Sequence, residues 1–91
     1  MSLHLVFSDA GLKSCLLRRH PQDLVLMLDD GVYGCHRWHQ ANLPSSMARL
    51  LRTDAEARGI SAVQRGAIET VDYDGFVELT EAHSPIISWK D

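Results

Sequence analysis

Positive charge is scarce in this 91-residue chain. Nine lysine and arginine residues stand against twelve aspartates and glutamates, so the formal net charge is −3. Arg18 and Arg19 are the only adjacent basic pair. Proteins that bind nucleic acid directly usually present a basic patch or stripe. The composition therefore gives no reason to expect a nucleic-acid surface.

Long apolar segments are lacking as well. A helix needs about 20 mostly apolar residues to cross a bilayer, and no segment approaches that length. The apolar stretch at the N-terminus has no lysine or arginine before it and reaches Asp9 too early for a signal peptide. We therefore expect a cytoplasmic protein with no membrane partner.

The chain has two cysteines, Cys15 and Cys35, which are too few for a disulfide scaffold. A reducing compartment would keep both as thiols. The sequence also lacks the G-x-S-x-G, P-loop, G-x-G-x-x-G and H-E-x-x-H motifs. We therefore expect no cofactor, and no nucleophile is paired with a base at a readable spacing.

What the chain does contain is an alternation of strand and helix patterns over residues 1–91, which we interpret as one domain. Strands are predicted at residues 3–7, 24–28, 68–71 and 86–89. Helices are predicted at residues 10–19 and 32–38 and after Asp72. The expected core residues are Leu5, Phe7, Leu26, Leu28, Leu50, Val71, Phe76 and Val77. The pattern predicts an α/β fold with a mostly parallel sheet of four or five strands and helices on both faces.

Residues 47–59 fit two structures. Their leucines, alanines and arginines favour one continuous helix by propensity. A strand over 47–52 and a helix over 54–58 would fit the strand–helix alternation better, with Asp54 as the N-cap and Gly59 just past the helix end. Periodicity alone does not decide between them.

Two polar segments have the residue types of a binding site. Residues 35–39 hold a cysteine and two histidines, but a zinc site needs three or four convergent ligands, so a solvated turn and no metal are expected. Asp29 and Asp30 follow a strand, at the sheet edge where α/β proteins bind ligands. The alternative, which we prefer, is that Asp29, Asp30 and Gly31 form a tight turn and cap the next helix.

The two thiols are expected to differ. Cys15 falls on the apolar face of the first helix, where burial and the helix dipole raise a thiol pKa, so it fits a packed core cysteine. Cys35 has His36 and Arg37 beside it, which can favour the thiolate, while Asp29 and Asp30 oppose this. We predict that Cys35 is a free surface cysteine that reacts faster than Cys15.

The C-terminal segment is too apolar for a free chain end, since terminal segments fray unless something holds them. Ile86, Ile87 and Trp89 could cover the edge of the chain's own sheet. We favour a subunit interface, because tryptophan is enriched in interface hot spots and a small domain gains stability from buried partner area.

Several segments together resemble the TusB/DsrH family of bacterial sulfur-relay subunits. The matching segments are Leu3-His4, LKSCL at residues 12–16, LVLMLDDGVY at 24–33, DAEARG at 54–59, DYDGFVELT at 72–80 and Ser88-Trp89. They span nearly the whole chain in order, and DYDGFV is the most specific of them.

The resemblance implies a DsrE-like α/β fold, and it favours a strand followed by a helix over residues 47–59. It also implies a complex with paralogous subunits of the C and D type (DsrF and DsrE), with a homo-oligomer when the chain is expressed alone. Such complexes pass persulfide sulfur between cysteines, either for 2-thiolation of the tRNA wobble uridine or in oxidative sulfur metabolism.

The chain departs from its catalytic relatives in one respect. Their persulfide cysteine follows the third strand, whereas residues 51–54 here are Leu-Arg-Thr-Asp. We therefore expect a non-catalytic subunit, in which Cys15, matched by the family's first-helix cysteine, is the first candidate for handling sulfur and Cys35 the second. The alternatives are a small cysteine-dependent persulfide transferase and a regulatory domain that binds a ligand at residues 29–31.

Overall fold

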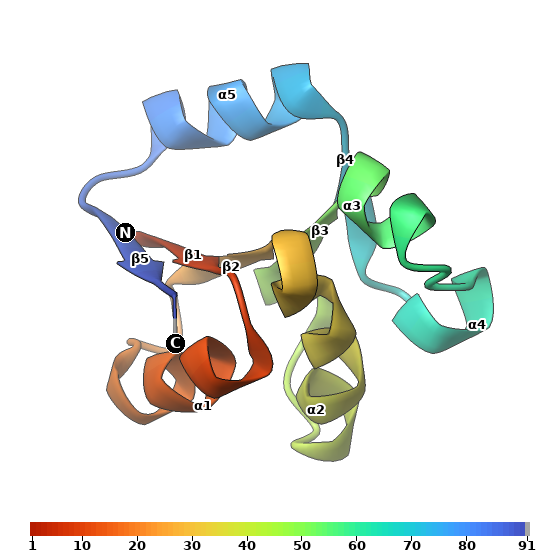
Figure 1. Ribbon diagram of the computed structural model, residues 1–91. Helices are drawn as coiled ribbons and strands as arrows, with labels where there is room; N and C mark the ends of the chain where they lie inside the picture. The colour runs from red at the N-terminus through yellow and green to blue at the C-terminus, as the bar shows by residue number, and fades with distance from the viewer. Residues whose placement is uncertain (91) are drawn as a thin grey trace.

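Five parallel strands form one sheet in the order β4-β3-β2-β1-β5 in the computed structural model, which describes residues 1–90 (Figure 1). The strands are β1 (Leu3–Val6), β2 (Leu24–Met27), β3 (Ala48–Leu51), β4 (Glu69–Val71) and β5 (Ile86–Trp89). The α-helices are α1 (Asp9–Arg18), α2 (Cys35–Gln40), α3 (Arg52–Ala57), α4 (Ala62–Arg65) and α5 (Tyr73–Ala82), and the 3₁₀ helices are η1 (Asp29–Gly34) and η2 (Ser45–Met47). The predicted α/β class and parallel sheet are confirmed.

Helices cover both faces of the sheet, as expected. Helices α1 and α2 lie on one face and α5 crosses the other (Figure 1). Strand β2 is the central strand of the sheet, flanked by β1 and β3, and all four of its residues are buried. Its continuous apolar run is typical of a parallel strand covered on both faces.

Local capping chemistry fixes where the two long helices begin. The Ser8 hydroxyl accepts a 2.9 Å hydrogen bond from the Gly11 N–H and caps α1. The Asp72 carboxylate accepts a 2.8 Å bond from the Gly75 N–H and caps α5. Each bond satisfies one of the N–H groups that a helix start leaves without a partner. Helix α1 begins and ends one residue earlier than the helix predicted over residues 10–19.

The segment 47–59 is a strand followed by a helix, so the single-helix alternative is wrong. However, α3 begins at Arg52, and Asp54 is not its N-cap. The Asp54 carboxylate instead accepts a 2.6 Å hydrogen bond from the N–H of Asp29. Gly59 does lie just past the helix end, with φ of +69°, a conformation that glycine adopts at little cost.

The second helix also differs from its prediction. Residues 29–34 form η1, and α2 follows over only six residues. Gly31 permits this turn, because a Cβ atom there would lie 2.0 Å from the Val6 carbonyl oxygen. Helix α4 was not predicted, although Ser61 and Gln64 form a capping box at its start.

The predicted core is right for the four leucines, partly right for Phe7, Val71 and Phe76, and wrong for Val77. Leu5, Leu26, Leu28 and Leu50 are buried, as expected. Phe7, Val71 and Phe76 are only partly buried. Val77 is exposed, because α5 turns that side chain away from the sheet. Its inward positions are Phe76 and Leu79, which pack against the leucines of β1 and β2.

Candidate functional site

The thiol of Cys15 is enclosed in the core. Cys15 lies on the inner side of α1 and packs in a cluster with Val6, Leu12 and Trp38. Burial raises the pKa of this thiol to about 11, against a partial lowering by Arg19, while Asp23 adds a further rise. The thiol is therefore protonated at neutral pH, as the sequence predicted for a packed cysteine.

Cys35 is buried too, with 2% of its surface exposed, so the prediction of a surface cysteine is wrong. It is the first residue of α2, and its side chain belongs to the same core cluster as Cys15. Burial raises the pKa of the Cys35 thiol, and the backbone N–H groups of His36 and Cys35 itself oppose the rise. The helix phase turns His36 to solvent and Cys35 inward, which residue type alone did not indicate.

The histidines of α2 do not converge on one point. His36 is exposed, and Nε2 of His39 lies 3.0 Å from the backbone oxygen of Arg65, which links α2 to α4. Within residues 1–90, no group of three or more His, Cys, Asp and Glu side chains is placed to hold a metal ion.

Asp29 and Asp30 lie at the carboxyl end of β2, as predicted, where Arg58 binds both of them. Arg58 Nη2 donates to Asp29 Oδ1, and its Nε donates to Asp30 Oδ1 at 2.9 Å. Asp54 approaches the same guanidinium at 4.0 Å. These carboxylates raise the pKa of Arg58, with the Asp30 hydrogen bond the largest cause. The acidic pair thus links η1 to α3 through Arg58, a partner that the sequence pattern did not indicate. The prediction that the pair caps the next helix is wrong, because neither η1 nor α2 has a side-chain cap.

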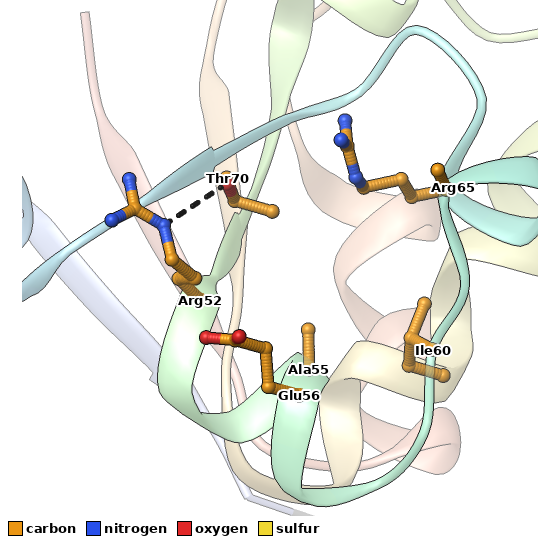
Figure 2. Close-up of a pocket in the computed structure, with 7 residues that line it drawn as sticks. Arg52, Ala55, Glu56, Ile60, Arg65 and Thr70 are labelled. Carbon is orange, nitrogen blue, oxygen red and sulfur yellow. Dashed lines mark hydrogen bonds between the residues drawn. The ribbon is translucent and has the colours of Figure 1, made fainter.

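The end of β3, where catalytic relatives are expected to carry a cysteine, borders a hollow of about 340 Å³ (Figure 2). Arg52 and Arg65 line it together with Glu56 and the Thr70 hydroxyl. Arg52 Nε lies 3.5 Å from Thr70 Oγ1. Among residues 1–90, neither Cys15 nor Cys35 is one of the residues that line the hollow.

The apolar C-terminal segment forms β5, which pairs with β1 and makes one edge of the sheet. Ile86 is 43% exposed, whereas Ile87 and Trp89 are partly buried. Trp89 Nε1 donates a 2.9 Å hydrogen bond to Nδ1 of the buried His4. The segment therefore covers the edge of the chain's own sheet, and Ile86 is the residue of the three that offers most surface to a partner.

A buried polar network that the sequence did not reveal holds this edge. His4 Nε2 lies 2.9 Å from Asp23 Oδ2, and Asp23 also accepts backbone hydrogen bonds from Ser2 and His20. Burial disfavours the Asp23 carboxylate, but the hydrogen bonds from His4, His20 and Ser2 outweigh it and lower the pKa of Asp23 to about 2. A histidine inside an apolar strand was the sequence signal for such a network.

None of the helices in the part of the chain that the structure describes has the length and apolar composition needed to cross a membrane.

Comparison with known proteins gives one consistent result. The model of the "DsrH like protein" family matches residues 6–86. Protein TusB of Cronobacter sakazakii is 37% identical over 76 residues, which cover 80% of each chain. Protein TusB of Serratia proteamaculans is 38% identical over 72 residues, which cover 74% of this chain and 75% of that protein. Protein TusB of Pectobacterium parmentieri is 31% identical over 71 residues, with the same coverage. The family match spans β2, β3 and β4 together with the capped helices α1 and α5, and on this ground the chain belongs to the DsrH-like family.

Proposed function

We propose that the chain is a non-catalytic subunit of a heteromeric sulfur-relay complex that serves 2-thiolation of the tRNA wobble uridine. The observation that carries the proposal is the family match over residues 6–86, together with relatives named Protein TusB. Membership of this family implies the relay and partners of the C and D type, and the relatives named Protein TusB favour the tRNA branch over oxidative sulfur metabolism.

The state of the two cysteines supports a non-catalytic role. A sulfur-accepting cysteine reacts as an accessible thiolate. Cys15 and Cys35 are both buried, and burial raises the pKa of each thiol. The end of β3 presents Arg52 where a catalytic relative would present its cysteine. The chain thus fits a supporting subunit better than a persulfide transferase.

The exposed edge of β5 supports assembly. An edge strand leaves a row of backbone groups available for pairing, and natural proteins usually protect such edges. Here the edge carries the exposed Ile86 and lies beside the N-terminus, where Ser84 N–H donates to the carbonyl oxygen of Met1. We place the subunit interface at this edge.

The decisive experiment is affinity capture of the tagged, full-length chain at native expression, followed by identification of the co-purifying chains. We expect two chains of similar size. A chain that purifies alone, and that carries persulfide on Cys15 or Cys35 after exposure to a sulfur donor, would favour the transferase alternative instead.

The interface is tested with two matched variants. Ile86→Lys places a charge on the proposed interface, and Val63→Lys places one on α4, at a side chain that is 91% exposed. We expect Ile86→Lys to lose the partners and Val63→Lys to retain them, with both variants folded by circular dichroism. If both variants retained the partners equally, β5 would not be part of the interface.

A further inference from the structure

The hollow beside the end of β3 is built from three elements. Arg52, Ala55 and Glu56 come from α3, Arg65 comes from α4, and Thr70 comes from β4. In Figure 2, the two arginines stand on either side of the opening, with Thr70 between them. Ala55 and Ile60 add apolar surface below the polar groups.

The two arginines of the hollow differ from most other arginines in the protein. Arg37, Arg49 and Arg58 each lie within 4.0 Å of a carboxylate. Across residues 1–90, Arg52 and Arg65 have no carboxylate at that distance, although Glu56 lines the same hollow. Two arginines therefore border one cavity without a bound counter-charge. The Arg52 Nε points to Thr70, and its terminal nitrogens point outward from the rim (Figure 2).

Their geometry leaves donors available. Arg65 Nη1 donates to the Ile68 carbonyl oxygen at 3.1 Å, which anchors the side chain. Arg52 uses only its Nε, in a 3.5 Å contact with Thr70 Oγ1. The remaining N–H groups of both arginines have no partner within the protein among residues 1–90. Thr70 receives the Arg52 contact through its oxygen, so its own O–H is free to donate.

We propose that this hollow binds a small oxyanion of the phosphate or sulfate type, held by Arg52 and Arg65 with the Thr70 hydroxyl as a third donor. Guanidinium groups bind such anions through paired N–H donors, and these charge-assisted bonds are stronger than neutral ones. The carboxylate of Glu56 repels the anion and limits its affinity. The apolar surface of Ala55 and Ile60 leaves room for an organic group on the anion.

The site is independent of the proposed assembly and is tested on the isolated chain. At 10.2 kDa the protein suits amide NMR. Sodium phosphate is added to the protein in one titration and sodium chloride in a second. Both are run at constant ionic strength, so that salt screens the charges equally throughout. We expect saturable shifts of the Ala55, Glu56 and Thr70 amides with phosphate and none with chloride. Phenyl phosphate should bind more tightly than phosphate if the apolar surface accepts an organic group, and equally if the free ion is the ligand.

Three substitutions should have three different effects on phosphate affinity. Arg52→Gln removes one guanidinium from an exposed side chain and should weaken phosphate binding about tenfold or more, the loss typical of a hydrogen bond to a charged group. Glu56→Gln removes the repelling carboxylate and should strengthen binding. Arg18→Gln removes an exposed arginine of α1, outside the hollow, and should leave binding unchanged.

Two results would overturn the site. One is the absence of a saturable phosphate response in the native chain. The other is an equal loss of affinity in Arg18→Gln and Arg52→Gln, since that would mean that phosphate responds only to overall charge.

Discussion

The indole nitrogen of Trp89 donates to Nδ1 of His4, 85 positions earlier in the chain, and this bond indicates which ring nitrogen of the histidine is the acceptor. An indole N–H can only donate, so Nδ1 must be an unprotonated acceptor. The ring proton is therefore on Nε2, which donates to Asp23 at 2.9 Å. His4 thus links β5, β1 and the residue that precedes β2.

Replacing Trp89 with Phe should lower the free energy of unfolding by about 1–3 kcal/mol, the usual cost of leaving a buried polar atom without its partner. The phenyl ring retains most of the packing, but Nδ1 of the buried His4 loses its donor. Urea unfolding followed by circular dichroism measures the change. Ser88→Ala, an exposed position in the same strand, should change stability by no more than about 0.5 kcal/mol. Equal losses would mean that the hydrogen bond contributes nothing.

Asp23 should make the fold sensitive to acid. The pKa of Asp23 is about 2 in the folded protein, below the ordinary value of about 3.9 for an unfolded chain. A lowered carboxyl pKa contributes stability above the unfolded value, and the contribution is lost as pH falls from about 4 toward 2. Unfolding measured between pH 6 and pH 2 should therefore show a steeper decline for the native chain than for Asp23→Asn. Parallel profiles would contradict this, and Asp74→Asn, at an exposed position, is the control.

Arg58 should stabilise the contact between η1 and α3. Arg58→Ala leaves the carboxylates of Asp29 and Asp30 close together without a cation, so the variant should be less stable than the native chain. The loss should shrink in high salt, because salt screens exposed charges. Adding Asp30→Asn should recover part of the stability. An equal loss at low and high salt would mean that Arg58 acts through packing rather than charge.

Four of the five strands and the two long helices were predictable because their signals are local. Four consecutive buried residues in β2 and the capping side chains of Ser8 and Asp72 are chemistry within a few residues. Strand β3 was ambiguous by pattern, and the family resemblance decided it. Helix α4 was missed because none of its residues is buried, so it has no apolar stripe to find.

The candidate site was less predictable, because its contacts join distant segments. His4 and Trp89 are at opposite ends of the chain, and Arg52 meets Thr70 only after β3 and β4 pair. The burial of Cys35 depends on how η1 and α2 pack against the rest of the core. A neighbouring histidine suggested an exposed thiol, but tertiary packing set the helix phase.

The two thiols should both resist alkylation in the native protein. At pH 8, each should react at least about tenfold more slowly than in the urea-unfolded chain, because reagent reaches a buried thiol only through local opening. Of the two, Cys35 should still label first, since backbone N–H groups at the start of α2 favour its thiolate. Mass spectrometry of peptides after timed labelling gives both rates. Labelling of Cys15 first would make it the more accessible thiol and the better candidate for carrying sulfur.

Replacing Cys15 with Ser should destabilise the fold by about 1–3 kcal/mol, because the new hydroxyl would be buried among apolar side chains without a matched partner. The control is Leu17→Ser, which also places a serine on α1, at a side chain that is 86% exposed. Its effect should stay near 0.5 kcal/mol, so the difference between the variants isolates burial from helix propensity. If the two serines cost the same, Cys15 is not enclosed in solution. The inference that Cys15 is a protonated and inaccessible thiol, which supports a non-catalytic role, would then no longer hold.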